Sequence, residues 1–515
     1  MTEAAVETPD LWSAVEARAA ATPDAEVLVD RRGRRVTFAE LRDRSLVMAG
    51  GLAEAGVAPG DVVAWLLPTW IEAIELAVAL QRLGTTQVPI IAIYRDREVT
   101  HCCRQAGARW LITPDEFRGF DFAAMGGRVA GELGLAHIVV GPGTAPTGDP
   151  AALPPLRAQP DAPRWIFYTS GTTSEPKGAR HTDRALAGVG ATMADMMGLG
   201  PTSRYALVFP FPHVGGILLL HSALHSGCTH LLEDAFDPAT SPAFLAGEGV
   251  THAGTGTPFH LAYLAAQRAD PRHRLFPHLV CCPGGASPKP PTLHADVKRE
   301  LGGVGIVSSW GLTEAPILTY SSLDDPDDKL ATTEGGPLSG VLLRSVRLDG
   351  SIAGPGQEGE LQVRGPQVTL GYVDDSLDVD AFADGWFRTG DLGVIDAQGY
   401  VRITGRLKDV IIRNGENIAA KEVEDLLFTH PAVADVAVIG LADERTGERV
   451  CAVVSTAGGQ PPLTFADMRA HLVAQGVRSQ AIPEQLEHVE VIPRNPAGKI
   501  TKQALKDRFA AVART

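Results

Sequence analysis

Cysteine, positive charge and long apolar runs are scarce in this sequence, and each scarcity excludes a class of protein. The 515 residues include six cysteines, and neither vicinal pair has the Cys-x-x-Cys spacing of a zinc or redox site. We therefore expect buried free thiols, in a reducing compartment, at Cys102, Cys103, Cys228, Cys281, Cys282 and Cys451. The formal net charge of −15 disfavours non-specific binding to nucleic acid or anionic membranes, because both are negatively charged.

Membrane and targeting signals are also missing. The most apolar run, Tyr205 to Leu224, is broken by Pro210, Pro212, His213 and a glycine pair, so no membrane span is expected. The first residues have neither the basic start nor the apolar core of a signal peptide. A soluble cytoplasmic protein is the simplest interpretation.

The size of the chain and its alternating pattern predict an α/β fold. A mass of 54.4 kDa exceeds what one hydrophobic core usually supports, so at least two domains are expected. Thr37 and Glu40 form a capping box that opens a helix to about Ala55. Further helical and strand patterns alternate, with a helix at 71–83 and strands at 61–67, 87–91, 110–112 and 165–167. This alternation is typical of mainly parallel sheets covered by helices.

The pattern changes twice further along the chain. A second α/β region is expected from about Arg184 to Tyr320, and short alternating segments after Thr333 predict a β-rich subdomain. Past Arg406 we expect a compact α+β unit with helices at 421–428 and 465–475 and strands at 435–439, 449–454 and 488–492. We therefore predict a large N-terminal domain, residues 1–407, and a small C-terminal domain, residues 408–515.

The segment Tyr168–Gly178 has the composition of a loop that binds phosphate. It follows an apolar strand, its glycines permit close backbone approach, and Lys177 adds positive charge. Its hydroxyl donors are Thr169, Ser170, Thr172, Thr173 and Ser174. It is not a Walker A loop, because Gly178 and Ala179 follow the lysine where Ser or Thr is required. The structural alternative is a flexible surface loop. We call this segment the predicted phosphate loop.

Nearly residue for residue, the predicted phosphate loop resembles that of the adenylate-forming superfamily, which comprises acyl-CoA synthetases, luciferases and adenylation domains. Five further segments resemble the same superfamily in the same order, and together they span Tyr168 to Lys502. The resemblance implies an AMP-forming acid–thiol ligase of the acyl-CoA synthetase branch. Its C-terminal domain would be mobile, and ATP, Mg²⁺ and coenzyme A would be its cofactor and co-substrates.

The resemblance also implies the residues that hold the nucleotide. The cofactor-binding residues would be Thr169, Ser170, Gly171, Thr173, Lys177, Gly284, Gly285, Ala286, Trp310, Gly311, Thr313, Asp391, Arg406 and Gly415. Trp310 stands where the family commonly has tyrosine, so stacking on adenine is retained while a phenolic hydroxyl is lost. Asp391 would accept hydrogen bonds from the ribose, with a turn aspartate as the structural alternative. Gly284 and Gly285 would lie against adenine, or form an ordinary turn.

The residues implied in chemistry lie in both domains. The catalytic residues would be Lys499, Thr172, Glu314 and His213, and Glu314 with Thr172 would bind Mg²⁺. His213 would gate the acyl pocket, although a histidine among apolar residues is more often a satisfied core residue. Lys499 alone would be a solvated charge, and the five other segments favour the functional interpretation. Lys408 would be the hinge of domain alternation.

The sequence narrows the acid and leaves its partner open. The segment after His213 carries no charge, so an amino-acid ammonium would be buried unpaired and a neutral-tailed acid is favoured. Small residues at Gly216, Gly254, Thr255, Gly256 and Gly284, on segments that line the family's acyl pocket, would make room for a bulky, hydrophobic acid. The segments Pro89 to Arg95 and Phe211 to His213 resemble those of ligases of alicyclic acids, which implies an alicyclic, terpenoid or steroid-derived acid. A carrier-protein phosphopantetheine is the alternative to coenzyme A. Luciferase-type oxidation, a non-catalytic nucleotide-binding relative and a homodimer also stay open.

Overall fold

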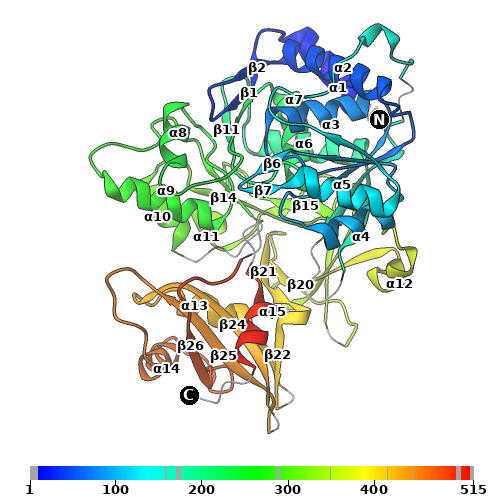
Figure 1. Cartoon of the computed structure of the whole chain (residues 1–515). Helices are drawn as coiled ribbons and strands as arrows, with labels where there is room; N and C mark the ends of the chain where they lie inside the picture. Colours follow the sequence, from blue (N-terminus) through cyan, green and yellow to red (C-terminus); the bar gives the residue numbers. More distant parts are fainter. Residues whose placement is uncertain are drawn as a thin grey trace, which may run out of the picture.

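The structure, a computed structural model, describes residues 10–156, 159–169, 175–285, 289, 292–347, 349–414, 416–443, 445–494 and 500–510. Within these ranges helices cover sheets on both faces, followed by a smaller C-terminal unit (Figure 1). The predicted α/β class is confirmed.

The first sheet contains the strand that leads into the predicted phosphate loop. Its order is β10 (Lys177–Thr182), β9 (Pro163–Thr169), β4 (Thr86–Pro89), β3 (Val62–Trp65), β5 (Trp110–Thr113) and β8 (Ala136–Val139). Neighbouring strands are parallel except β9 and β10, which pair antiparallel with Lys177 opposite Thr169. The two stems of the loop are therefore adjacent strands.

The second sheet joins strands from distant parts of the sequence. Its order is β2 (Arg35–Thr37), β1 (Glu26–Asp30), β12 (Thr229–Leu232) and β11 (Arg204–Leu207), and bridges at His252 lead on to β13 (Cys282–Gly284), β14 (Ile306–Leu312), β15 (Ala315–Tyr320) and β16 (Gly336–Pro337). The predicted α/β region from Arg184 to Tyr320 is therefore incomplete, because β1 pairs in parallel with β12. Val27, Leu28 and Val29 are all fully buried, and a strand buried on both faces needs such an interior position.

Helices form three layers around the two sheets (Figure 1). The outer face of the first sheet carries α4 (Asp96–Ala106) and α5 (Phe122–Leu133), and that of the second carries α8 (Ser241–Gly247), α9 (Thr257–Ala269) and α10 (Leu293–Glu300). Between the sheets lie α1 (Leu11–Ala21), α2 (Phe38–Glu54), α3 (Ile71–Arg82), α6 (Asp183–Met196) and α7 (Val214–Ser226). Along β3, Val63 and Trp65 face the middle layer while Ala64 faces α4 and α5, as strand alternation requires.

One of the predicted local features agrees with the structure and one predicted strand does not. The capping box at Thr37 is formed: Thr37 accepts from the Glu40 amide and the Glu40 carboxylate accepts from the Thr37 amide. The predicted strand at 488–492 was wrong in position, because β26 (Gln485–His488) pairs in parallel with Cys451–Val454 and ends with that pairing.

An antiparallel sheet follows, with β17 (Leu342–Val346), β18 (Glu358–Arg364), β20 (Trp386–Ile395), β19 (Phe382–Ala383) and β21 (Val401–Arg406). Short elements complete this part of the chain: β6 (Glu116–Phe117), β7 (Phe120–Asp121), α11 (Asp327–Thr332) and α12 (Asp378–Ala381). The predicted β-rich character after Thr333 agrees with this sheet.

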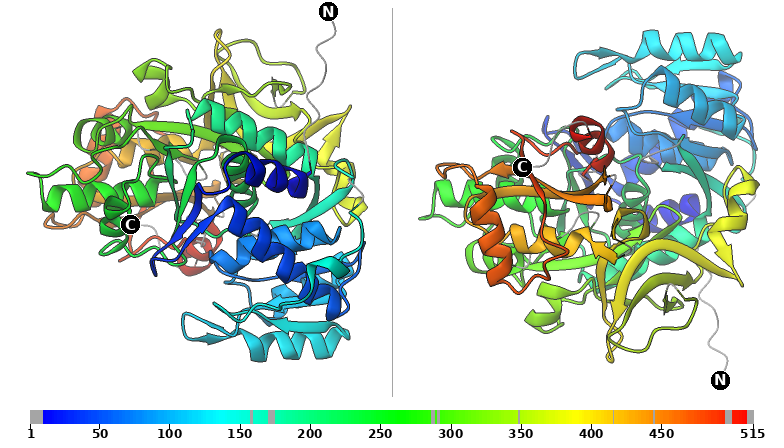
Figure 2. Two further views of the ribbon diagram at one scale, coloured as in Figure 1. Left: turned by 90° about the horizontal axis from the view of Figure 1, so that it is seen from above. Right: turned by 90° about the horizontal axis from the view of Figure 1, so that it is seen from below.

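The C-terminal unit has its own sheet and its own cores. It consists of β22 (Val410–Arg413), β23 (Glu416–Ala419), β24 (Val433–Asp443), β25 (Gly447–Thr456) and β26, with α13 (Ala420–Leu427), α14 (Phe465–Ala474) and α15 (Lys502–Phe509). Its buried apolar clusters begin at Ile411, whereas the buried residues of the large N-terminal core end at Val401. The predicted boundary after residue 407 stays a prediction, and it lies between these cores. Figure 2 shows α14 and α5 on opposite sides of the molecule.

The cysteines behave as packing residues. All six are free and buried, and burial raises the pKa of the Cys103 and Cys451 thiols to about 12. Such thiols stay protonated at neutral pH and are poor nucleophiles.

Across the part of the chain that the structure describes, no helix has both the length and the apolar character needed to cross a membrane.

Candidate active site

A buried carboxylate, Asp391, joins two sheets through opposite side-chain oxygens. The Trp310 indole Nε1–H donates to one oxygen at 2.8 Å, and Arg406 forms an ion pair with the other, with its Nε at 2.8 Å. Asp391 is 3% exposed, so both bonds are shielded from water. The structure therefore brings three predicted nucleotide-binding residues together.

Strand pairing explains this arrangement. Asp391 on β20 and Arg406 on β21 are direct cross-strand partners, while Trp310 comes from β14 of the other sheet. Lys408 follows in the single turn Leu407–Asp409, where burial and the neighbouring Arg406 charge lower the pKa of its ammonium group. Positive charge is thereby concentrated at the edge of the N-terminal unit.

A second carboxylate, Glu314, lies in the turn between β14 and β15. The Tyr372 hydroxyl donates to Glu314 Oε1 at 2.8 Å, and the Thr369 amide donates to the Glu314 carbonyl at 2.7 Å. His181 Nε2 lies 2.8 Å from the Thr313 carbonyl oxygen. Burial lowers the pKa of His181 to about 4, so the ring is neutral and Nε2 carries the donated hydrogen. Both main chain and side chain of the turn are thus held in place.

Tyr372 and His181 were missed by the sequence analysis. The Lys177 ammonium lies 5.7 Å from the Tyr372 ring centre, so one tyrosine contacts both Lys177 and Glu314. No motif singled it out, because its partner Glu314 is 58 residues away in the sequence. His181 gave a weak signal, since it lies three residues after the predicted phosphate loop.

The predicted adenine-binding glycines lie flush against neighbouring strands. Gly285 has a φ of +147°, and a Cβ there would lie 2.8 Å from Ser309 Oγ. A Cβ on Gly311 would lie 2.3 Å from the Ile317 amide nitrogen. Ser309 Oγ also donates to the Gly284 carbonyl at 3.1 Å. Glycine is therefore required for the close packing of β13, β14 and β15, next to Trp310.

His213 begins α7 and borders an apolar hollow. Its Nδ1 accepts from the Gly215 amide at 3.2 Å, and its ring meets Phe209 edge-on at 6.3 Å between centres. The hollow has a free volume of about 10 Å³, and its lining is Pro89, Ile90, Ile91, Tyr94, Phe167, Tyr168, Pro212, His213, Val214 and Thr313. Among these described lining residues none is acidic, lysine or arginine. Thr313 joins the hollow to the Glu314 turn.

The glycine argument for a roomy pocket is wrong at three positions. A Cβ on Gly216 would lie 2.2 Å from the Phe211 carbonyl oxygen, one on Gly254 2.8 Å from the Tyr205 hydroxyl, and one on Gly284 2.8 Å from Ile306 Cγ2. Protein atoms fill the space that these side chains would take. The glycines permit tight packing and do not enlarge the hollow.

Seven predicted site residues lie outside the described residues: Ser170, Gly171, Thr172, Thr173, Ala286, Gly415 and Lys499. The residues on either side of the Lys499 segment are described. Arg494 and Ile500 form an antiparallel bridge, and Arg494 donates to Asp435 of β24 at 2.7 Å. Lys502, three residues after Lys499, pairs with Glu424 of α13 at 2.7 Å.

Taken together, an apolar hollow meets an edge that carries buried carboxylates and several cations. Residues 15–373 match the AMP-binding enzyme family, and residues 422–499 match the AMP-binding enzyme C-terminal domain. The chain belongs to this family, the adenylate-forming superfamily, within its acyl-CoA synthetase branch.

Relatives and solved structures agree with this assignment. The chain is 33% identical to the salicyl-AMP ligase / salicyl-S-ArCP synthetase of Mycobacterium tuberculosis over 92% of this chain and 86% of the relative. It is 30% identical to the 3-[(3aS,4S,7aS)-7a-methyl-1,5-dioxo-octahydro-1H-inden-4-yl]propanoyl:CoA ligase of Rhodococcus jostii over 92% of this chain and 94% of the relative. ATP-bound MatB from Rhodopseudomonas palustris superposes with a TM-score of 0.88 at 25% identity, covering 97% and 99% of the two chains.

The chain is therefore an AMP-forming acid–thiol ligase that activates a carboxylic acid with ATP. The expected ATP, Mg²⁺ and coenzyme A are the cofactor and co-substrates of CoA ligases in this family. The similar solved structures have a large N-terminal domain and a small C-terminal domain, which is the arrangement expected from the sequence.

Proposed function

We propose that this enzyme converts a neutral, hydrophobic carboxylic acid into its coenzyme A thioester. The single observation that supports this most is the apolar hollow beside Thr313, one residue from Glu314. An acid with its tail in the hollow would direct its carboxylate toward the predicted phosphate loop and Glu314. In the first step a carboxylate oxygen attacks the α-phosphorus of ATP and pyrophosphate leaves. In the second the thiol sulfur attacks the acyl carbon, AMP leaves and the thiol proton passes to solvent.

Each predicted site residue has a distinct role in this proposal. Asp391, oriented by Trp310 and Arg406, accepts the ribose hydroxyls, and Lys177 attracts the departing pyrophosphate. Lys499 supplies positive charge at the α-phosphate during adenylation, where orientation and electrostatic stabilisation dominate. Glu314 has the hard carboxylate oxygen and the fixed orientation, through Tyr372, that fit Mg²⁺, with Thr172 as its second ligand. When bound, Mg²⁺ would neutralise phosphate charge.

The acid is proposed to have an uncharged tail. An ammonium or a second carboxylate would meet no opposite charge in the described lining of the hollow. The name of the Rhodococcus relative supports a bulky alicyclic acid as the substrate. To admit such an acid, the side chain of His213 or Tyr94, which line the hollow, must turn aside. The free volume of about 10 Å³ lies far below the roughly 300–1,000 Å³ of ligand pockets, so a smaller acid also requires side chains at the hollow to move.

A carrier-protein phosphopantetheine is the second candidate for the thiol, supported by the relative named for salicyl-S-ArCP synthesis. In either case we propose that residues 408–515 rotate about Lys408 between the two steps, so that Lys499 leaves and Gly415 approaches the thiol. The acidic surface does not separate the two acceptors, since carrier proteins are acidic as well.

Two measurements test the proposal. Pyrophosphate release should depend on the acid across a panel of alicyclic, fatty, aromatic and amino acids, with alicyclic acids giving the highest kcat/KM. Mass spectrometry should then detect the thioester with coenzyme A. No release with any acid, or preference for an amino acid, would contradict the acid assignment, and loading of a phosphopantetheinylated carrier alone would replace coenzyme A.

A further inference from the structure

Residues 369–373, which we call the bridging segment, connect two parts of the candidate active site that are far apart in the sequence. The Thr369 amide donates to the Glu314 carbonyl at 2.7 Å, and the Val373 amide donates to the Gly178 carbonyl at 2.8 Å. Gly178 is the second residue of β10, the strand at the end of the predicted phosphate loop. The main chain of the bridging segment therefore ties the Glu314 turn to β10.

The side chain of Tyr372 adds contacts to both of these parts. Its hydroxyl donates to Glu314 Oε1 at 2.8 Å, and the Lys177 ammonium lies 5.7 Å from the centre of its ring, within the range of cation–π attraction. Tyr372 is 5% exposed. Burial, followed by the Glu314 charge, raises the pKa of Tyr372, so the hydroxyl keeps its proton at neutral pH and donates to the carboxylate. One buried side chain thus reaches a predicted Mg²⁺ ligand and a predicted phosphate-binding lysine.

The hydrogen bond from Tyr372 occupies one oxygen of Glu314 and leaves the other for a ligand. Among the residues that the structure describes, none bonds to Glu314 Oε2. A carboxylate held at one oxygen keeps a fixed orientation, and groups that orient a metal ligand in this way commonly change metal affinity by roughly 10–100-fold. The hydroxyl is therefore placed to set the orientation that Glu314 offers to Mg²⁺.

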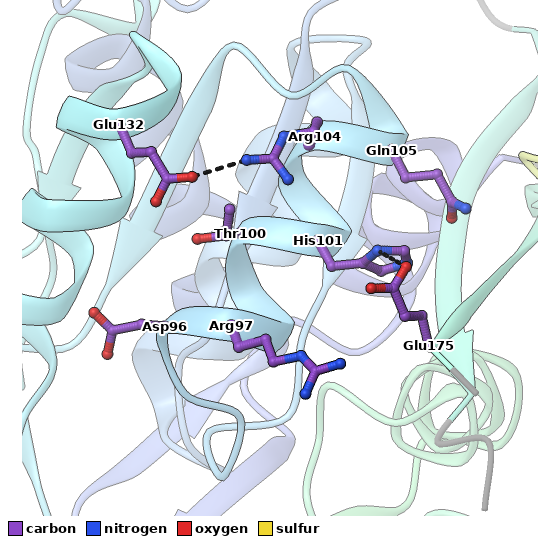
Figure 3. Close-up of a pocket in the computed structure, with 8 residues that line it drawn as sticks. All are labelled: Asp96, Arg97, Thr100, His101, Arg104, Gln105, Glu132 and Glu175. Carbon is purple, nitrogen blue, oxygen red and sulfur yellow. Dashed lines mark hydrogen bonds and ion pairs between the residues drawn. The ribbon is translucent and has the colours of Figure 1, made fainter. Parts of the chain in front are cut away.

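The residues just before Lys177 are exposed. Figure 3 shows Glu175, two residues before Lys177, on the wall of a cavity of about 580 Å³, where it faces His101 of α4. The Glu175 side chain is 62% exposed. The position of Lys177 therefore rests on the pairing of β10 with its neighbours and on the Tyr372 ring.

We propose that Tyr372 is a positioning residue for adenylation with two separable parts, a hydroxyl that orients Glu314 for Mg²⁺ and a ring that holds Lys177 for the departing pyrophosphate. This rests on the proposed roles of Glu314 and Lys177. Since the main chain of the bridging segment has its own hydrogen bonds, substitutions of the Tyr372 side chain change these two contacts while β10 and the Glu314 turn stay in place.

The hydroxyl is tested by Tyr372→Phe, which keeps the ring. We expect the Mg²⁺ concentration that gives half-maximal pyrophosphate release to rise about tenfold, with KM for the acid unchanged and kcat restored at saturating Mg²⁺. The Kd for ATP, measured by calorimetry with and without Mg²⁺, should weaken only when Mg²⁺ is present. An unchanged Mg²⁺ dependence in Tyr372→Phe would overturn the role of the hydroxyl.

The ring is tested by Tyr372→Leu. The Kd for pyrophosphate is measured by calorimetry without Mg²⁺, so that Glu314 does not contribute. It should rise about threefold in Tyr372→Leu and stay unchanged in Tyr372→Phe, because only the leucine variant loses the cation–π contact with Lys177. Equal pyrophosphate affinities in the two variants would overturn the role of the ring.

Tyr400→Phe is the matched control. The Tyr400 hydroxyl donates to Asp325 Oδ1 at 2.8 Å, and the Lys329 ammonium lies 4.8 Å from the Tyr400 ring centre. Tyr400 therefore has the same two kinds of contact as Tyr372, with partners that are not predicted site residues. Its substitution should leave the Mg²⁺ dependence and the Kd for pyrophosphate unchanged, and a change equal to that of Tyr372→Phe would overturn the inference.

A double-mutant cycle tests whether the hydroxyl acts through Glu314. In a Glu314→Gln background, Tyr372→Phe should change the Kd for ATP in Mg²⁺ by less than about twofold, since the ligand that the hydroxyl orients is already lost. A purely structural role of Tyr372 would weaken ATP binding equally in both backgrounds, and that result would overturn the inference.

Failure of the proposed function gives a different result. If the intact enzyme releases pyrophosphate with no neutral, hydrophobic acid, the acid assignment fails, while the calorimetric Kd values for ATP and pyrophosphate still decide the role of Tyr372. ATP binding by the intact enzyme that does not depend on Mg²⁺ would overturn the inference itself.

Discussion

At the scale of single residues, Trp310 replaces the tyrosine that is common in the family and makes a hydrogen bond of its own to Asp391. Tyrosine is common at this position in the family, and the indole keeps an aromatic face while its Nε1–H binds Asp391 at 2.8 Å. Asp391 is then held from two sides, with Arg406 on its other oxygen. A rigid carboxylate binds ribose with less loss of conformational entropy than a free one.

The first prediction concerns that bond. Trp310→Phe keeps a stacking surface and removes the donor, so KM for ATP should rise about tenfold, because hydrogen bonds to charged groups contribute about 1.5–3 kcal/mol. Pyrophosphate exchange at varied ATP measures this. Trp386→Phe on β20 is the control, since Trp386 stacks on Arg344 and Arg364, and its KM for ATP should not change.

Lys499 gives the second prediction at this scale. Lys499→Ala should slow adenylation by on the order of 10²–10³-fold, because a preorganised positive charge at the α-phosphate is lost, and should spare thiolation of a supplied adenylate. Lys506→Ala, in the last turn of α15, is the control and should retain both activities. Full pyrophosphate exchange in Lys499→Ala would reject its catalytic role.

Among the elements, helix α6 shows how glycine decides helix packing. A Cβ on Gly190 would lie 2.5 Å from His221 Cβ of α7, whereas one on Gly188, half a turn earlier, would meet nothing within 4 Å. The close approach of α6 and α7 therefore requires glycine at position 190 but not at position 188.

This contrast gives a matched pair of variants. Gly188→Ala should stabilise the protein by about 0.5–1 kcal/mol, because alanine has the higher helix propensity. Gly190→Ala should destabilise it by about 1–3 kcal/mol through overpacking. Urea unfolding measures both free energies, and equal effects of the two substitutions would contradict the packing geometry.

Helix α3 carries a carboxyl group whose titration affects stability. Burial, and then the neighbouring Glu72 charge, raise the pKa of Glu75 to about 7 from its ordinary value of 4.5. Between these pH values the folded protein holds a proton that the unfolded chain has lost, so stability falls as the pH rises through this window.

Replacing that group should remove the pH dependence it causes. Glu75→Gln should match the native stability below about pH 4.5 and exceed it by up to about 3 kcal/mol above pH 7. Glu116→Gln, at an exposed position on β6, is the control and should not change the profile. A constant difference at all pH values would show that Glu75 does not titrate in this way.

For the whole molecule, the connection between the two units determines whether both reaction steps can occur. Lys408 lies in the turn between β21, which carries Arg406, and β22, which begins the C-terminal sheet. Lys408→Pro fixes φ and should impair thioester formation more than adenylation. Lys408→Ala keeps backbone freedom and should retain the ratio of the two rates, measured by thioester and pyrophosphate assays. Equal loss of both steps in the proline variant would indicate misfolding rather than a blocked hinge.

Local physical chemistry alone was sufficient to predict many elements. The capping box at Thr37, the buried free cysteines and the strand before the predicted phosphate loop depend on neighbouring residues and on burial, both of which leave patterns in the sequence. The family resemblance added the order of the site residues. It named Trp310, Asp391 and Arg406, which the structure joins by a hydrogen bond from Trp310 to Asp391 and an ion pair between Asp391 and Arg406.

The tertiary structure alone decided the rest, because those features depend on contacts between residues far apart in the sequence. The pairing of β1 with β12, the bond from Tyr372 to Glu314 and the pairing of the bridging segment with β10 each join segments without a shared motif. The sequence also indicated free space beside Gly216, Gly254 and Gly284. Only the tertiary structure shows that Phe211, Tyr205 and Ile306 fill this space.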